Sequence, residues 1–189
     1  MKRRIAKPPP RRVFLDTNVV NMILDYGEMI HDCVEVPTDF KGRLRSDIEA
    51  LRGIFFTGQR AFWELAVSPL TYREVIRTKD ATHQQRLTSW FFEIWQYWRE
   101  FLHSTRDLPS FSEAEEERLG LISSGILEVL PDLNDRVLIC DAVVYRCDAF
   151  CTRDWSTILR HREQLGDLSL RIVTPTEWWE LIRSWGEFW

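Results

Sequence analysis

The fold is decided by the stretch Val13-Phe14-Leu15-Asp16-Thr17-Asn18-Val19, a short apolar run that ends at an acid. A continuous apolar run of this kind is typical of a strand that is buried on both faces of a parallel sheet. Residues 17–25 follow at once and are predicted to form a helix. A buried strand that feeds directly into a helix indicates an α/β fold.

The rest of the chain repeats this alternation of apolar runs with longer helical segments. Further strands are predicted at residues 61–67, 126–130, 149–152 and 170–173, and a loop at residues 28–43. Helices are predicted at residues 46–56, 81–103, 112–123 (with Ser112 and Glu115 as a capping box), 134–146 (capped by Asn134) and 156–164, and others begin at Ser68-Pro69 and Thr176. Five strands alternating with helices predict a three-layer α/β fold with a mainly parallel sheet.

The length of 189 residues suggests one domain. Residues 1–12 hold six Lys or Arg and a Pro triplet, so they are predicted to be a flexible basic arm. Residues 13–189 then form the domain, with a helical insertion around 28–60 and an aromatic helix around 81–103.

Composition excludes several classes of protein. Hydrophobic residues make up 44% of the chain, which argues against wholesale disorder, and the net charge of −4 argues against a simple nucleic-acid coat protein. The four cysteines show no CxxC pair, which favours free thiols in a reducing cytoplasm. No apolar run is long enough to span a bilayer, so no membrane association is expected.

Four acids occupy equivalent places in the predicted units. Asp16 and Asp154 follow strands, Glu74 lies in the helix after a strand, and Asp135 begins a helix. In an open parallel sheet, residues at the carboxyl ends of the strands line the crevice where ligands bind. We therefore expect these four carboxylates to converge at one edge of the sheet.

Clustered carboxylates repel one another, so such a group requires a cation. Oxygen ligands without His or Cys favour a hard ion such as Mg²⁺ or Mn²⁺. An ion held in this way can lower the pKa of water and stabilise charge on a phosphodiester. The acids therefore predict a metal site for phosphodiester hydrolysis.

The same residues resemble the motifs of PIN-domain nucleases. Residues 13–19 are similar to the opening signature of that family, and residues 68–75 around Glu74 are similar to its second acidic motif. Residues 134–139 and 147–154 resemble the third and fourth. The resemblance extends over about residues 13–175, and the four motifs occur in the order that the family has.

The resemblance implies a metal-dependent endoribonuclease with a five-stranded sheet in the order 3-2-1-4-5. Asp16, Glu74, Asp135 and Asp154 would hold the metal, as the catalytic residues of such an enzyme. Asn18 would orient Asp16 and Thr152 would fix the turn into Asp154, which makes both supporting residues.

The resemblance also implies partners. RNA is the expected substrate, and many small PIN proteins are toxins that pair with an antitoxin protein. A homodimer is a further expectation, because the chain has nine Trp residues and could reserve an apolar face for contact. The long stretch between Asp16 and Glu74 and the aromatic helix depart from the usual short toxin.

Two alternatives remain open at the sequence level. Asp141 competes with Asp135 for the third position, although six helical residues turn by about 240° and place them on different faces. The 19-residue separation from Asp154 favours Asp135, and Asp141 would then approach the edge of the site or pair with an Arg. A catalytically inactive PIN-like module that binds RNA or acts as a scaffold is the main rival function. A third alternative is another α/β protein with an acidic pocket, such as a phosphatase or a receiver domain, and the receiver domain fits poorly because no Lys lies near the later strands.

Overall fold

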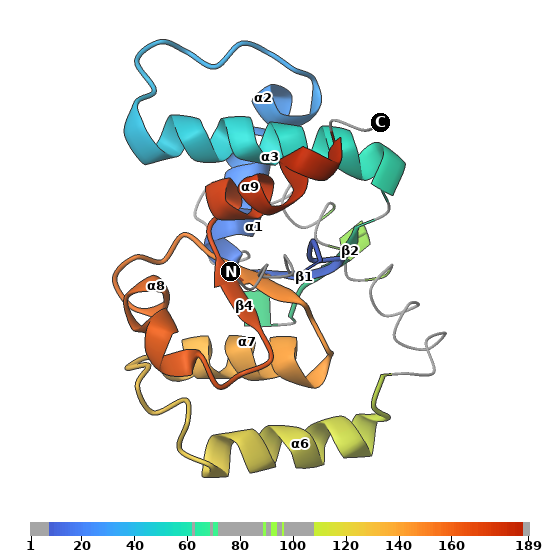
Figure 1. Cartoon of the computed structure of the whole chain (residues 1–189), viewed down its shortest axis with the longest axis vertical. Helices are drawn as coiled ribbons and strands as arrows, with labels where there is room; N and C mark the ends of the chain where they lie inside the picture. The colour runs from blue at the N-terminus through green and yellow to red at the C-terminus, as the bar shows by residue number, and fades with distance from the viewer. Residues whose placement is uncertain are drawn as a thin grey trace, which may run out of the picture.

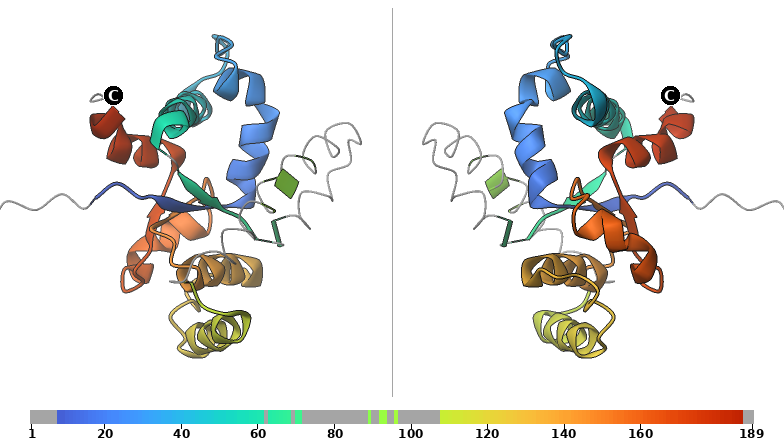
Figure 2. Two further views of the ribbon diagram at one scale, coloured as in Figure 1. Left: turned by 90° about the vertical axis from the view of Figure 1, so that its right-hand side faces the viewer. Right: turned by 90° about the vertical axis from the view of Figure 1, so that its left-hand side faces the viewer.

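The computed structural model describes residues 8–61, 63–68, 70–71, 89, 92–93, 96 and 108–186. Its centre is a parallel sheet with helices on both faces (Figures 1 and 2). The strands within the described residues are β1 (Arg12–Leu15), β2 (Glu64–Ala66), β3 (Ala149–Cys151) and β4 (Arg171–Val173), in the order β2-β1-β3-β4. The three-layer α/β class predicted from the sequence is thus confirmed, with a four-stranded sheet in the described part.

The register of the sheet places one central residue of each strand side by side. Phe14 of β1 pairs with Ala66 on one side and with Phe150 on the other. The rings of Phe14 and Phe150 stack with their centroids 5.5 Å apart. Because helices cover both faces of the sheet, β1 and β3 are buried on both sides, which explains their apolar sequences.

One face of the sheet is covered by α1 (Thr17–Asp25), α2 (Gly27–His31), α3 (Gly42–Ala61) and α9 (Pro175–Gly186). Val13 and Leu15 point to this face, where they join a buried cluster that includes the fully enclosed Trp178 of α9. Helices α3 and α9 pack against each other. The segment after α1 therefore contributes a long helix to the core of the domain.

The opposite face is covered by α6 (Phe111–Ser123), α7 (Leu133–Val144), the short helix α8 (Ile158–His161) and the 3-10 helix η1 (Arg162–Leu165). Phe14 and Phe150 point into the apolar cluster on this side. Successive residues of β1 thus face opposite layers, as the geometry of a strand requires.

The strand predicted at residues 126–130 is wrong, because these residues form turns between α6 and α7. Gly125 has a φ of +76° and starts the reversal. Leu127 and Leu130 are nevertheless buried in the core. A short apolar run fits a buried turn as well as a buried strand, and here the side chains are enclosed without sheet pairing. The predicted five-stranded sheet therefore lacks this strand.

Several helices begin or end at residues other than those predicted from the sequence. The predicted loop at 28–43 contains α2, and the helix predicted at 46–56 extends over all of α3. The capping box of α6 is formed by Ser110 and Glu113 instead of Ser112 and Glu115, because both pairs fit the motif and the helix begins at the earlier one. The cap of α7 is Asp132, which accepts from the N–H of Asn134.

The predicted flexible arm ends earlier than residue 12. The N–H groups of Arg11 and Arg12 both donate to Asp148 Oδ2 at 2.9 Å. Arg12 is buried and forms an ion pair with Glu64 at 2.8 Å. These contacts fix the start of β1, so the arm prediction is wrong for residues 11 and 12, and residues 1–7 lie outside the described residues.

The aromatic helix predicted at 81–103 lies largely outside the described residues, although the four described positions within it are helical. Cys140, Cys147 and Cys151 are buried free thiols and Cys33 is an exposed one. Within the part of the chain that the structure describes, no helix has both the length and the apolar character needed to cross a membrane.

Candidate functional site

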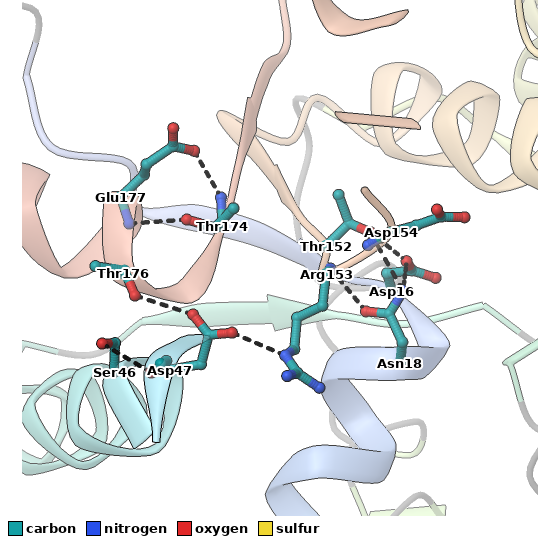
Figure 3. Close-up of polar contacts among 11 residues, drawn as sticks. Asp16, Asn18, Ser46, Asp47, Thr152, Arg153, Asp154, Thr174, Thr176 and Glu177 are labelled. Atoms are coloured by element: carbon teal, nitrogen blue, oxygen red, sulfur yellow. Dashed lines mark hydrogen bonds and ion pairs between the residues drawn. The ribbon is translucent and has the colours of Figure 1, made fainter. Parts of the chain in front are cut away.

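Asp16 and residues 152–154 meet where two neighbouring parallel strands end. The N–H of Asp16 donates to the carbonyl of Cys151 at 3.0 Å, which extends the pairing of β1 and β3 by one residue. Thr152 then donates its N–H to the carbonyl of Val173 in β4 at 2.9 Å. The backbone at the candidate site is therefore held by the sheet on both sides, and Figure 3 shows the side chains that gather there.

The carboxylate of Asp16 is enclosed, with 5% of the residue exposed. Its Oδ2 accepts from the hydroxyl of Thr152 at 2.5 Å and from the amide of Asn18 at 2.6 Å. Thr152 is itself fully buried. Asn18 thus lies in contact with the acid that it was expected to orient, and Thr152, expected to fix the turn into Asp154, contacts Asp16 as well.

Burial raises the pKa of the Asp16 carboxyl from 3.8 to about 7. The hydrogen bonds from Thr152 and from the backbone N–H of Thr17 oppose this change, while the negative charges of Asp135 and Asp154 add to it. The charged form of Asp16 is therefore unfavourable in this pocket unless a positive charge lies beside it.

Asn18 and Thr152 also tie Asp16 to the segment that carries Asp154. Asn18 Oδ1 accepts from the N–H of Arg153 at 2.8 Å, and Thr152 Oγ1 accepts from the N–H of Asp154 at 3.0 Å. The two polar side chains thus bridge the end of β1 and the turn after β3. Their effect is to fix the position of Asp154 relative to Asp16.

Asp154 caps the turn that follows it, the structural role that competes with metal binding at this position. Its Oδ1 accepts from the N–H and hydroxyl of Ser156 and from the N–H of Thr157, at 2.7 to 2.9 Å. Burial raises the pKa of the Asp154 carboxyl, but the hydrogen bonds from Thr157 and Ser156 outweigh it, and the pKa lies below its usual value. Asp154 is therefore held in its charged form.

Asp135, in the first turn of α7, reaches the site through Thr157, a residue that sequence analysis missed. The Thr157 hydroxyl contacts Asp135 Oδ2 at 2.8 Å and also contacts Asp154 Oδ2. A hydroxyl has one proton and can donate to only one carboxylate. Two carboxylates around a single donor leave negative charge that a cation would offset.

Asp141 lies elsewhere, on the buried face of α7. It accepts from Arg118 Nε at 3.0 Å and forms an ion pair with the same guanidinium at 2.6 Å. Ser68 Oγ donates to its other oxygen at 3.0 Å. The structure thus places Asp141 in an Arg pair, the second of the two roles open to it from the sequence, and this pair anchors the chain just after β2.

Glu74 lies outside the described residues, so the structure does not place it relative to the other acids. Among the residues that are described, no three His, Cys, Asp or Glu side chains are grouped closely enough to hold a metal ion. Asp16, Asp135 and Asp154 share one end of the sheet and interact through their charges, with Thr157 between the latter two.

A second feature that sequence analysis missed is the link from Arg153 to helices α3 and α9. Arg153 Nε donates to Asp47 Oδ2 of α3 at 2.9 Å, and Asp47 Oδ1 accepts from the hydroxyl of Thr176 in α9 at 2.9 Å. In Figure 3 the Arg153 guanidinium points away from Asp16 and toward Asp47, which is itself buried. Because the N–H of Arg153 binds Asn18, helices α3 and α9 are connected to the Asp16 pocket through one residue.

The start of α9 is fixed by a reciprocal pair of bonds. Thr174 N–H donates to Glu177 Oε2 at 2.9 Å, and Glu177 N–H donates to Thr174 Oγ1 at 3.1 Å. This is the pattern of a capping box with Pro175 at the first helical position, so the cap predicted at Thr176 is two residues earlier. Thr176 is thereby free to bind Asp47.

Comparison of the chain with protein-family models finds no match, and comparisons with curated proteins and with solved structures find none either.

Proposed function

We propose that this protein is a metal-dependent endoribonuclease with a PIN-like site. The observation that supports it most is the buried carboxylate of Asp16, held at the end of β1 by Asn18 and Thr152 and connected through the Thr152 hydroxyl to the backbone N–H of Asp154. An isolated buried carboxylate is costly, and one that also faces two other acids is more so. Its placement is explained if a divalent cation binds there.

Asp16, Asp154, Asp135 and Glu74 are the residues that would hold Mg²⁺ or Mn²⁺. When bound, the ion would lower the pKa of a water molecule and stabilise charge on the phosphodiester. Asp16 would release its proton on binding, because a ligand must be deprotonated. Asn18 and Thr152 would keep its Oδ2 in place, while Thr157 would donate to Asp154 or Asp135 as the charges require.

The order of the strands also supports a PIN-like assignment. The third of the five expected strands, at residues 126–130, is absent, so the observed β3 and β4 correspond to the expected fourth and fifth strands. With that strand left out, the observed order β2-β1-β3-β4 is the same as the expected order 3-2-1-4-5. The segment 126–130, where strand 3 was expected, leads into α7 and delivers Asp135 to the site as that strand would have done.

The biological assignment remains part of the proposal. A toxin of a toxin–antitoxin pair, acting in the cytoplasm and bound by an antitoxin protein, is one use of such a nuclease. A homodimer would bury the exposed apolar residues Leu119 and Ile122 of α6 and Leu133 of α7. The long helix α3 sets this chain apart from short toxins, and its Asp47 contacts Arg153 beside the candidate site.

The alternative is a PIN-like module that binds RNA or acts as a scaffold without catalysis. The observation in its favour is that Asp154 already accepts several hydrogen bonds as a turn cap. Calorimetric titration with Mn²⁺ distinguishes the two, because the enzyme requires metal binding that depends on Asp16 and the module does not. RNA binding without any binding of Mn²⁺ would favour the module.

The test of the proposal is cleavage of single-stranded RNA by the full chain with Mg²⁺ or Mn²⁺. We expect products with a 5′-phosphate, no cleavage in EDTA, and a loss of at least about a hundred-fold in the Asp16→Asn variant, on the scale of other metal-site losses. Asp167→Asn is the matched control, since Asp167 is exposed and lies outside the candidate site. Equal cleavage by wild type and Asp16→Asn would refute the proposal.

A further inference from the structure

Trp155 follows Asp154 directly and stands at the rim of the candidate site, with 44% of the residue exposed. Its backbone is part of the turn that Asp154 caps through Ser156 and Thr157. The turn is therefore held in one shape, and the indole has a fixed place beside the acid.

Arg43 of α3 lies over the ring of Trp155, with its Cζ 3.9 Å from the ring centroid. Arg43 itself is exposed. A guanidinium over an indole is attracted by the ring and holds it in orientation, while its own N–H groups stay available at the edge. Helix α3 thus contacts both chain neighbours of Asp154. Its Asp47 binds Arg153, and its Arg43 lies over the ring of Trp155.

The charge at this end of α3 is unusual for a helix. The first turn contains no acid, and Lys41 and Arg43 lie at its start, whereas Arg45 is paired with Glu49. Cations near the positive end of a helix dipole are unfavourable. The arrangement gains if an anion binds there, and it lies next to a carboxylate group that would otherwise repel a polyanion.

We propose that Trp155 and Arg43 form the entry site for single-stranded RNA, in which one base stacks on Trp155 and Arg43 contacts the adjoining phosphate. This deepens the proposed function and rests on it. Trp155 follows Asp154 in the chain and belongs to the turn that Asp154 caps, so the entry site adjoins one of the proposed metal ligands. Stacking requires an unpaired base, which makes single strands the preferred substrate.

The experiment compares binding of a short single-stranded RNA with binding of an abasic strand of the same length. Binding is measured by fluorescence anisotropy in the Asp16→Asn background, in which RNA is not cut. The variants are Trp155→Leu, the conservative Trp155→Phe, and Arg43→Gln. Arg45→Gln is the matched control, because Arg45 carries the same charge on the same helix and forms an ion pair with Glu49.

We expect Trp155→Leu to weaken binding of RNA about five- to a hundred-fold, the range that base stacking supplies, and to leave abasic binding within about two-fold. Trp155→Phe should retain most of the affinity. Arg43→Gln should weaken the binding of both strands and reduce by about one the number of counterions that binding releases, measured as the slope of log K against log salt. Both effects should be larger than those of Arg45→Gln. In the cleavage assay, Trp155→Leu should raise KM and leave kcat within about three-fold.

The proposal is overturned if Trp155→Leu binds both strands as the parent does, or if Arg43→Gln and Arg45→Gln are equivalent. If wild type still cuts RNA in that case, the nuclease stands without this entry site, and Trp155 is better assigned to a protein partner. If Trp155 governs RNA binding but wild type never cuts, the entry site stands and the nuclease fails. If wild type binds no RNA, both are lost.

Discussion

Replacing Asp16 by Asn should stabilise the protein at neutral pH, because the pocket disfavours a charged carboxylate. The pKa of Asp16 is about 7 in the folded protein and 3.8 in a model peptide. Between these values the folded state binds more protons than the unfolded state, so the free energy of unfolding falls as pH rises. The free energy of unfolding is therefore unaffected below about pH 4, falls progressively between about pH 4 and pH 7, and levels off above pH 7.

The size of the effect follows from the shift. A difference of about three pKa units corresponds to roughly 4 kcal/mol lost from the wild type by pH 8, and roughly 2 kcal/mol lost by pH 5. Asn is neutral at every pH and keeps an oxygen for Thr152 and Asn18. Its extra N–H group lacks an assigned partner, which costs about 1–3 kcal/mol at all pH values. The advantage of the variant should therefore grow by about 2–3 kcal/mol between pH 5 and pH 8.

The assay is urea unfolding followed by Trp fluorescence in EDTA, with the free energy taken from the midpoint and slope. The control is Asp167→Asn, an exposed site where we expect no change of this kind. Mn²⁺ should remove the difference at pH 8 by stabilising the wild type alone, since an ion that binds only the folded state raises its stability. A variant advantage that does not grow with pH would refute the burial argument.

Three further substitutions test the contacts around the site. Asp47→Asn should weaken the ion pair with Arg153 and lower kcat for RNA cleavage about three- to ten-fold, with little change in KM. Steady-state cleavage kinetics measure both constants, and a raised KM alone would speak against a positioning role. Thr157→Val should reduce Mn²⁺ affinity about ten-fold in calorimetry, because such outer contacts orient metal ligands, and unchanged affinity would count against it. Arg118→Leu should lower the free energy of unfolding by about 3–5 kcal/mol, because Asp141 is left buried without its partner, and a loss under about 1 kcal/mol would contradict this.

Sequence analysis located some contacts of the site through local signals and one, that of Thr152, through the resemblance to a family. The helix predicted at residues 17–25 matches α1 at both ends, because an apolar run, an acid and a helical segment follow one another without a gap. The contact of Asn18 with Asp16 spans two residues. Thr152 was assigned through the resemblance to a family, and its bond to Asp16 joins residues 136 positions apart.

The parts that it missed depend on tertiary contacts or on ambiguous patterns. Residues 126–130 are apolar enough for a strand, but Arg136 binds the carbonyl of Leu130 at 2.7 Å and closes a turn. The bond between Arg153 and Asp47 joins residues 106 positions apart and leaves no periodic signal. Threonine hydroxyls are common on protein surfaces, so nothing in the sequence singles out Thr157. Only the fold shows that its hydroxyl lies between Asp135 and Asp154.

The most direct test of the central claim is the position of bound Mn²⁺ in crystals of the full chain, located by its anomalous scattering. We predict a peak bonded to an oxygen of Asp16, at a distance near the roughly 2.0–2.1 Å that Mg²⁺ keeps to its ligands. Asp154, Asp135 or Glu74 should supply further ligands, directly or through water. No peak at Asp16 with Mn²⁺ in excess, or a peak at Asp141 instead, would contradict the account.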